Sequence, residues 1–369
     1  MTKITHKDVF QQLETWAPKS FAYDWDNVGL QVGSTKDETT GILVTLDVTE
    51  AIVDEALNVG ANLIVAHHPM LFKALKQIDV DSVKGKLIQK LIKHDITVYA
   101  SHTNLDIAEG GVNDLLSEAI GLKETKPLIP THQDSLVKVS VFTPRSHVEA
   151  VVDALSEAGA GHIGNYSHCT FQSRGTGTFK PLEGTNPYIG KKHELAEVDE
   201  MKIETIVKEK DLSNVITKMK EAHPYEEVAY DIYPLENKGK EYGLGRIGNL
   251  EQEVTLEELA KLVKERYEVE HLRYVGDLSK KVQRVAILGG SGDKSIAAAL
   301  RAGADVFITG DVTFHPAQEA EWEGLAIIDP GHHIEKIMKE ATKKYLERHF
   351  TPLKVVASKQ STEPFRFLS

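Results

Sequence analysis

The 369 residues exceed one ordinary hydrophobic core, so we expect two domains, or one domain that carries a large insertion. The formal net charge of -12 argues against duplex nucleic acid as the main partner. A single cysteine excludes an intrachain disulfide and suits a reducing compartment. The charged start of the chain and the lack of a long apolar run predict a cytoplasmic protein without a signal peptide or a membrane span.

The opening third of the chain alternates the patterns of strands and helices. The expected strands are the apolar runs 41–48, 62–66 and 96–100. The expected helices that follow them are 49–59, about 82–94 and about 111–120. Short apolar runs are typical of strands buried on both faces of a parallel sheet, so this alternation predicts an α/β fold.

The last third repeats the alternation. Its expected strands are 283–288, 305–309 and 325–329, and its expected helices are 293–302, about 314–322 and about 332–348. Residues 56–65 also resemble 299–308, either because a unit was duplicated or because αβ units often share a helix–glycine–strand pattern. We therefore expect a discontinuous, two-lobed α/β core of duplicated strand–helix units, made of residues 1–130 and 237–369.

The middle of the chain, residues 131–236, follows a different order. Its expected strands are 136–142, 168–179, 198–208 and 228–234, and its expected helices end near 158 and span 211–222. This strand–helix–strand–strand–helix–strand order is that of ferredoxin-like domains. The flanking stretches KETKPLIP and LENKGKEYGLG have the composition of linkers, so the sequence predicts an inserted ferredoxin-like domain.

Histidines and acids directly follow three of the expected strands, and ligands collect at such strand ends in α/β sheets. They are His67 and His68, then Asp106, then His332 and Glu335. Singly, each has an ordinary explanation, such as a loop histidine or a helix cap. Together they predict a site for two divalent ions, in which Asp106 could bridge the pair. Imidazole and carboxylate ligands suit zinc first, with iron or manganese as alternatives.

The ligand set also bears on activity. Five ligands are too few to saturate two ions, so positions stay open for water or substrate, as in catalytic sites. This favours a metal-dependent hydrolase of a nucleotide, a phosphate ester or a related heterocycle, with His315 or His102 moving protons. The alternative is a non-catalytic metal-binding adaptor or regulatory protein, because the sequence reveals no substrate pocket.

Three other segments are weaker candidates. The glycine-rich stretch 288–295 could hold an anion on its backbone N–H groups, although it does not match a P-loop. Residues 24–27 could reach the metal site or simply form a turn, and 309–311 end another expected strand. Residues 222–227 of the middle segment are expected to serve in packing or an interface.

Six motifs spread over the core match a known family. They are WDNVGLQVG (25–33), HHP (67–69), SHTNLD (101–106), GLGRIG (243–248), TGD (309–311) and GHHIE (331–335). With these motifs the chain resembles the Nif-three-like family, whose members are often catalogued as GTP cyclohydrolase I type 2 homologues. The catalogue name does not give the activity, because the Cys-and-His zinc constellation of true GTP cyclohydrolase I is absent.

The resemblance implies further properties. It places a dinuclear centre on the five residues named above and implies a toroidal homohexamer with metal sites facing an inner cavity. Many members space the last His and Glu four apart, whereas His332 and Glu335 are three apart; both spacings share a helix face. The middle segment resembles the PII/CutA type of ferredoxin-like domain found in longer members, without a recognisable nucleotide-binding loop.

Overall fold

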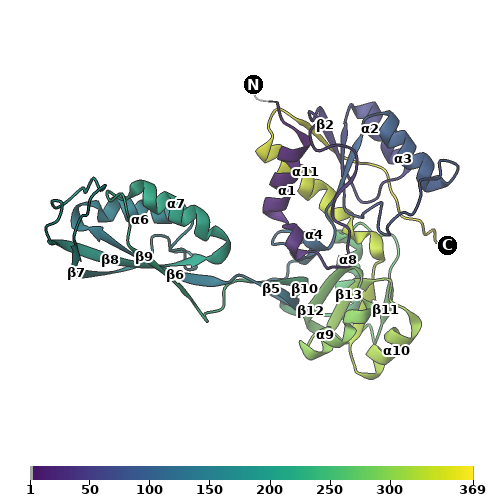
Figure 1. The fold of residues 1–369 in the computed structure, drawn as a ribbon. Helices are drawn as coiled ribbons and strands as arrows, with labels where there is room; N and C mark the ends of the chain where they lie inside the picture. Colours follow the sequence, from purple (N-terminus) through teal and green to yellow (C-terminus); the bar gives the residue numbers. More distant parts are fainter. Residues whose placement is uncertain (1–2, 369) are drawn as a thin grey trace. The chain divides into compact units, whose positions relative to one another are not determined.

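The computed structural model describes residues 3–368, which divide into two compact units. The core unit comprises residues 3–132 and 242–368, and the middle unit comprises residues 133–241 (Figure 1). The sequence-based boundaries were 130/131 and 236/237, a few residues earlier in each case.

The stretches expected to be linkers lie largely in two long strands. These are β5 (Lys123–Gln133) and β10 (Glu241–Thr255), which are neighbours in one sheet. Most side chains of β5 are exposed because it is an edge strand, so its charged residues gave it the composition of a linker. A Cβ on Gly243 would overlap the carbonyl of Ile129, so glycine lets the two strands approach. The linker interpretation was wrong for 123–130 and 241–245.

The first sheet of the core unit is built mainly from the opening third. Its order is β1 (Gly29–Val32), β4 (Thr97–Ala100), β3 (Leu63–Ala66), β2 (Gly41–Thr45) and β15 (Lys354–Ala357). The last four strands are parallel, and β1 pairs antiparallel with β4. The helices of this part are α1 (His6–Trp16), α2 (Glu50–Val59), α3 (Val83–Lys93), α4 (Thr103–Ile107) and α5 (Val112–Ala119).

The second sheet comes mainly from the last third. Its order is β11 (Arg273–Val275), β14 (Ala326–Asp329), β13 (Val306–Gly310), β12 (Lys281–Ser291), β10 and β5. β12, β13 and β14 are parallel, whereas β11 and β10 run antiparallel to their neighbours β14 and β12. Its helices are α8 (Leu256–Arg266), α9 (Ile296–Arg301), α10 (Phe314–Trp322) and α11 (Met338–His349).

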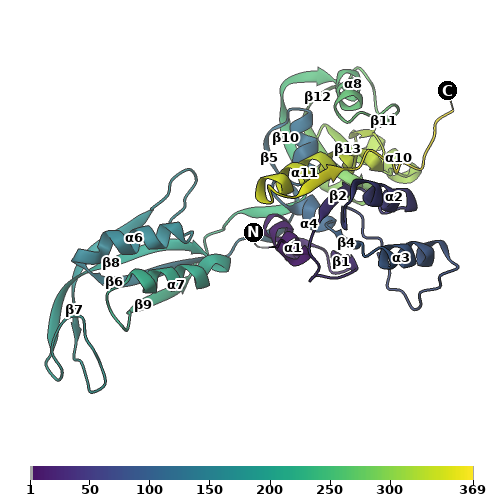
Figure 2. The ribbon, with the colours of Figure 1, turned by 90° about the horizontal axis from the view of Figure 1, so that it is seen from above.

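One hydrophobic core joins the two sheets of the core unit. Val65 of β3 and Ile308 of β13 are fully buried in the same cluster, together with Leu116 of α5 and Met338 of α11. α11, yellow in Figures 1 and 2, also packs on β2 and β15. The two lobes expected from the sequence therefore share a core, which brings their strand ends into one neighbourhood.

Local signals explain where several elements begin and end. α2 starts after Thr49, whose side chain accepts a hydrogen bond from the backbone N–H of Ile52, and it ends at Gly60 with a φ of 77°. The helix expected from residue 332 instead begins as a 3₁₀ turn over His332–Ile337, and α11 follows it. In a 3₁₀ turn, residues three apart are aligned along the axis, so His332 and Glu335 still point the same way.

The middle unit is one antiparallel sheet with two helices. In chain order it contains β6 (Leu136–Pro144), α6 (Val148–Glu157), β7 (Thr170–Phe179), β8 (Ala196–Lys208), α7 (Leu212–Ala222) and β9 (Tyr230–Pro234), and the sheet order is β7-β8-β6-β9. Both helices cover the same face of the sheet (Figure 1). Alternate residues of β6 and β8, such as Val139, Val141 and Ile203, face these helices because successive side chains of a strand point to opposite faces.

The described chain thus has a mixed α/β fold with three sheets. Among its described helices, none is both long enough and apolar enough to cross a membrane.

Candidate metal centre

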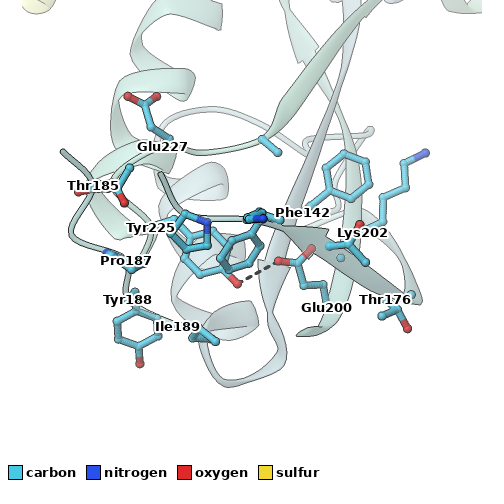
Figure 3. Close-up of a pocket in the computed structure, with 18 of the residues that line it drawn as sticks. Phe142, Thr176, Thr185, Pro187, Tyr188, Ile189, Glu200, Lys202, Tyr225 and Glu227 are labelled. Atoms are coloured by element: carbon cyan, nitrogen blue, oxygen red, sulfur yellow. Dashed lines mark hydrogen bonds between the residues drawn. The ribbon is translucent and has the colours of Figure 1, made fainter. Parts of the chain in front are cut away.

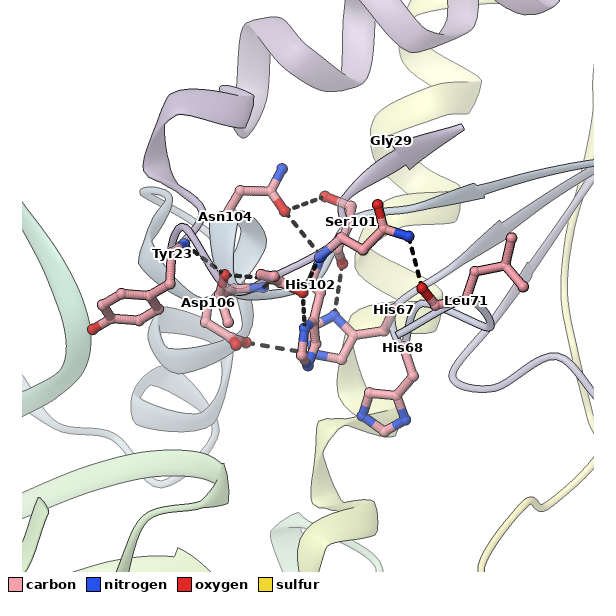
Figure 4. Close-up of polar contacts among 12 residues, drawn as sticks. Tyr23, Gly29, His67, His68, Leu71, Ser101, His102, Asn104 and Asp106 are labelled. Carbon is pink, nitrogen blue, oxygen red and sulfur yellow. Dashed lines mark hydrogen bonds and ion pairs between the residues drawn. The ribbon is translucent and has the colours of Figure 1, made fainter. Parts of the chain in front are cut away.

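Four histidine side chains meet at the carboxyl ends of the strands of the core unit. His67 and His68 follow β3, His102 precedes α4 after β4, and His332 follows β14. The rings of His67, His68 and His102 lie 5.2–5.6 Å apart by their centroids, and the ring of His332 lies 5.2 Å from that of His68. Figure 4 shows the first three rings beside Asp106 of α4.

Each ring is held through its Nδ1 atom by an oxygen acceptor. The Nδ1 of His67 lies 2.8 Å from the backbone oxygen of Ser101. The other three pair with carboxylates: His68 with Asp47 at 2.7 Å, His102 with Asp26 at 2.9 Å and His332 with Asp311 at 2.7 Å. An acceptor at Nδ1 puts the proton there and leaves Nε2 as the atom that can bind a metal.

Three of the four Nε2 atoms, those of His67, His68 and His332, converge on one carboxylate. Glu335 Oε2 lies 3.0 Å from His68 Nε2, 3.2 Å from His332 Nε2 and 3.8 Å from His67 Nε2. Asp106 Oδ1 lies 3.5 Å from the Nε2 of His67. Glu335 belongs to two candidate ligand groups and Asp106 to one, so Glu335 is better placed than Asp106 to be shared between two sites.

Three groups of ligand atoms, each within 4.8 Å of one another, could hold a metal ion. They are His67, Asp106 and Glu335; His68, His332 and Glu335; and His67, His68 and His102. The five residues predicted as ligands are therefore brought together, and His102 joins them as a sixth candidate.

Two buried atoms of the cluster have no hydrogen-bond partner among the described residues. They are Nε2 of His67 and Oδ1 of Asp106, on side chains that are 0% and 6% exposed as whole residues. A buried polar atom without a partner costs free energy, so such pairs are rare in folded proteins. A divalent cation between the two atoms would satisfy both, and the residues therefore fit a metal.

The protonation states of the cluster without metal follow from burial and charge. Burial would raise the pKa of Glu335, but the hydrogen bonds from His332 and His68 and the nearby ring of His67 hold it well below its usual range. Burial and the Glu335 carboxylate raise the pKa of Asp106 well above its usual range. Burial also lowers the pKa of His67, which favours the neutral, metal-binding ring.

For His68 and His332 the pKa is raised instead of lowered. Burial acts to lower the pKa of His68, but its bonds to Asp47 and Glu335 prevail and raise it to about 10. The hydrogen bond to Glu335 outweighs burial and raises the pKa of His332 to about 9. Without a metal, protons on these rings balance the charge of Glu335, and a metal would replace them.

Glycines let Glu335 reach the centre. β12 continues to Ser291, three residues beyond the end of the expected strand 283–288. At Gly290, with a φ of 69°, a Cβ would overlap Oε1 of Glu335 and lie 3.3 Å from Nε2 of His332. The glycine-rich stretch that we considered for anion binding therefore packs against a candidate metal ligand.

His315 does not join the cluster. It is exposed in the first turn of α10, where its ring contacts Phe314, and no hydrogen bond or ion pair links it to the cluster within residues 3–368. His333 also stays apart, with its Nε2 buried and unpartnered among these residues.

Four residues orient or make room for the candidate ligands, and sequence reasoning missed two of them and gave little weight to the other two. Asp47 and Gly290 were missed, whereas Asp26 and Asp311 were only weak candidates. One signal could have found Asp47: it lies two residues beyond β2, at the same edge of the sheet as His67.

Exposed aromatic rings lie beside the cluster. The Trp25 ring lies 6.4 Å from that of His102, 5.8 Å from Phe72 and 5.6 Å from Tyr23, on which it stacks. The side chains of Trp25 and Phe72 are 58% and 46% exposed. Large exposed rings next to a polar cluster are typical of binding surfaces.

A pocket of about 900 Å³ opens next to His332 and Asp311. Its wall also carries five cationic side chains, those of Arg273, Lys336, Lys339, Lys359 and Arg366. Carboxylates of the wall balance part of this charge; Asp329, for example, pairs with Arg273.

Comparison with known proteins identifies similar chains over the full length. The family model described as Duf34/NIF3 (NGG1p interacting factor 3) matches residues 4–364. Proteins named GTP cyclohydrolase 1 type 2 homolog are 52% identical in Halalkalibacterium halodurans, over 98% of each chain, and 48% identical in Bacillus subtilis, over 99% of each chain. A crystal structure of a Bacillus cereus protein related to NIF3 superposes with a TM-score of 0.93, at 48% identity and over 100% of both chains.

Proposed function

This chain belongs to the Duf34/NIF3 family, and from that membership and the geometry of the cluster we propose that it is a metal-dependent hydrolase with a dinuclear centre. The observation that carries the proposal is the convergence of three histidine Nε2 atoms and Asp106 on Glu335, with two buried atoms left without partners. A purely structural polar cluster would satisfy those atoms within the protein.

The ligands divide between two positions. His67, Asp106 and Glu335 would hold one divalent ion, and His68, His332 and Glu335 would hold the other. Zinc is the expected metal, with iron or manganese as alternatives. Bound divalent ions supply a water nucleophile near neutral pH and stabilise negative charge that develops on the substrate.

The protein's own groups would orient the substrate and move protons. His102 is the proposed proton carrier, because Asp26 fixes its ring 5.2 Å from that of His67 and leaves Nε2 free. The exposure of His315 and its lack of contact with the cluster do not support the catalytic role that we expected for it.

The surroundings of the centre support the substrate class. Trp25 and Phe72 offer exposed ring faces on which a planar heterocycle could stack. Lys336, Lys339 and Arg366 line the adjoining pocket and could pair with phosphate oxygens. The proposed substrate is therefore a nucleotide, a phosphate ester or a related heterocycle.

Several broader expectations remain part of the proposal. The element order of the middle unit and its strand order β7-β8-β6-β9 support a ferredoxin-like domain inserted in a discontinuous core. We retain a cytoplasmic location and a toroidal homohexamer as proposals that rest on composition and on the family resemblance.

The deciding experiment screens nucleotides, phosphate esters and cyclic amides with metal-loaded protein. Asp106→Asn should lose turnover and metal together, whereas Asp81→Asn, an exposed loop change of the same kind, should lose neither. His102→Ala should lose turnover and keep at least the ion held by His68 and His332. If metal-loaded protein turns over no substrate of these classes above the Asp106→Asn level, the non-catalytic adaptor becomes the better explanation.

A further inference from the structure

The middle unit contains a pocket of its own, with a volume of about 600 Å³. It lies on the face of the sheet that α6 and α7 leave uncovered. Register shows this, because Phe142 pairs with Lys202 and Gly175 pairs with Glu200, while Ile203, the residue after Lys202, faces the helices. Tyr188 and Tyr225, from two connecting segments, close over this face (Figure 3). The volume is that of a small-molecule site.

A buried carboxylate forms the polar part of this pocket. Glu200 of β8 is only 8% exposed, and the hydroxyl of Tyr225 donates a hydrogen bond to its Oε1 at 3.0 Å (Figure 3). A Cβ on Gly177 of the neighbouring β7 would overlap Oε2 of Glu200, so the glycine makes room for the carboxylate. Burying a charged carboxylate is costly unless a cation pairs with it.

The chain supplies no such cation among its described residues. Lys202 lines the pocket, but its Nζ lies 3.1 Å from the carboxylate of Glu204. Arg174 is bound by both oxygens of Asp199, at 2.7 Å and 3.0 Å. The remaining cation in the wall, Lys180, forms no ion pair with Glu200 within residues 3–368. The acid is therefore left without a charged partner.

Aromatic rings line the same pocket as the carboxylate. The ring of Tyr225 lies 5.8 Å from that of Phe179 and 6.4 Å from that of Tyr188. Burial and the Glu200 carboxylate raise the pKa of Tyr225, which keeps its hydroxyl a neutral donor. Aromatic faces attract cations through the ring quadrupole, and they also accept the apolar body of an organic ligand.

We propose that this pocket binds a small organic cation, whose ammonium or guanidinium group pairs with Glu200 while its carbon skeleton packs on Tyr225, Tyr188 and Phe179. The proposal rests on the middle unit alone and is independent of the hydrolase activity. An anion would meet the uncompensated charge of Glu200. A metal ion would lack a full ligand set, because every group of three or more close metal-ligating side chains among the described residues lies in the core unit.

The test is calorimetric titration of the full-length protein with three probes: agmatine, spermidine and tetramethylammonium. Inorganic phosphate serves as the anionic comparison. At least one cationic probe should bind with one site per chain, and phosphate should not compete for that site. Raising the salt concentration should weaken the binding only modestly, because the pair is buried.

Two matched variants locate the site. Glu200→Gln keeps the shape and the bond from Tyr225 but removes the charge, so binding should weaken about tenfold or more. Glu197→Gln makes the same change at an exposed position of the same strand outside the pocket and should leave binding unchanged. Tyr225→Phe keeps the ring, so it should weaken binding less than Glu200→Gln does. Thermal unfolding and circular dichroism of each full-length variant, compared with the parent protein, report that the middle unit is folded.

Three results would overturn the proposal. One is the absence of saturable binding by all three cationic probes at millimolar concentration. Another is equal affinity of a probe for the parent protein and for folded Glu200→Gln. The third is a change of oligomeric state in Glu200→Gln, which would mean that a second copy of the chain fills the pocket instead of a small molecule.

Discussion

The core unit and the middle unit each contain a buried acid that packs against a strand glycine, but the neighbours of the two acids differ. Gly290 of β12 makes room for Glu335, and Gly177 of β7 makes room for Glu200. Histidine Nε2 atoms approach Glu335 at 3.0–3.8 Å, whereas Glu200 is bonded by a tyrosine hydroxyl in a pocket that aromatic rings line. A buried carboxylate requires positive charge, and its neighbours decide the kind: imidazoles favour a transition metal, and aromatic faces favour an organic cation.

The supports of the two acids differ as well. In the core unit, Asp47, Asp26 and Asp311 each pair with the Nδ1 atom of one histidine and so fix the orientation of its ring. In the middle unit, among residues 3–368, Glu200 has one hydrogen bond of this kind, from Tyr225. The first arrangement suits fixed coordination geometry, and the second leaves room for a ligand to complete the site.

The largest effect on the metal centre is expected when the carboxylate of Glu335 is removed. Glu335→Gln should empty both metal positions, because Glu335 belongs to the ligand groups of both. The loss of affinity should exceed about 100-fold, the upper range for residues that only support ligands. Elemental analysis measures the outcome, with exposed Glu340→Gln as the control. Retention of two ions by Glu335→Gln would show that the ligand assignment is wrong. The same variant should leave the binding of an organic cation to the middle unit unaffected.

Removing a supporting acid should have a smaller effect. Asp47→Asn weakens the bond that orients His68, so metal affinity should fall about 10- to 100-fold. Thr362 also bonds Asp47, and Thr362→Val removes that contact without touching His68. Competition with a chelator should therefore rank the two variants clearly. Equal affinities in Asp47→Asn and the parent protein would contradict an orienting role.

Alanine substitutions at Gly290 and Gly324 distinguish the cost of backbone strain from the effect of a steric overlap with Glu335. Gly290 and Gly324 have φ values of 69° and 77°, so alanine at either position should cost about 1–2 kcal/mol of unfolding free energy. A Cβ at 324 meets nothing within 4 Å, whereas one at 290 would overlap Glu335. Only Gly290→Ala should also lose metal. Chemical denaturation and elemental analysis test both parts, and metal binding by Gly290→Ala at the parent level would refute the crowding argument.

The smallest expected effect is the release of protons from the histidines when metal binds. Without metal, His68 and His332 have pKa values of about 10 and about 9, so both rings are protonated at pH 7. Metal binding at pH 7 should release about one proton from each, and affinity should increase as the pH rises toward 9. Calorimetry in buffers of different ionisation enthalpy counts the protons. A heat of binding that does not depend on the buffer would contradict these protonation states.

The same shifts give the metal-free protein a defined pH dependence. Because both pKa values lie above the ordinary 6.5, the two rings contribute stability below pH 6.5. That contribution should be lost as the pH rises through about 9 to 10. Thermal unfolding of metal-free protein across this range measures it, with metal-loaded protein as the comparison.

The sequence by itself determined the local elements and the candidate ligands. Apolar runs such as 62–66 and 325–329 are strands because a strand buried on both faces must be apolar along its length, and polar residues directly after them lie at the sheet edge. That rule pointed to His67, His68 and His332, and to Asp106 and Glu335 in the turns of helix that follow, as candidate ligands without knowledge of the sheet order. It failed where composition misleads, as for β5, whose exposed side chains have the character of a linker.

Only the tertiary structure decided which of these residues meet and what supports them. Asp26 and His102 are 76 positions apart and pair because β1 lies antiparallel beside β4, a choice that no local periodicity encodes. The position of His315 away from the cluster and the membership of Glu335 in two candidate ligand groups likewise depend on how two sheets pack on one core. The pocket around Glu200 arises because two connecting segments close over one sheet face. Local patterns record which side chains are buried, whereas sites depend on long-range packing that brings distant strand ends together.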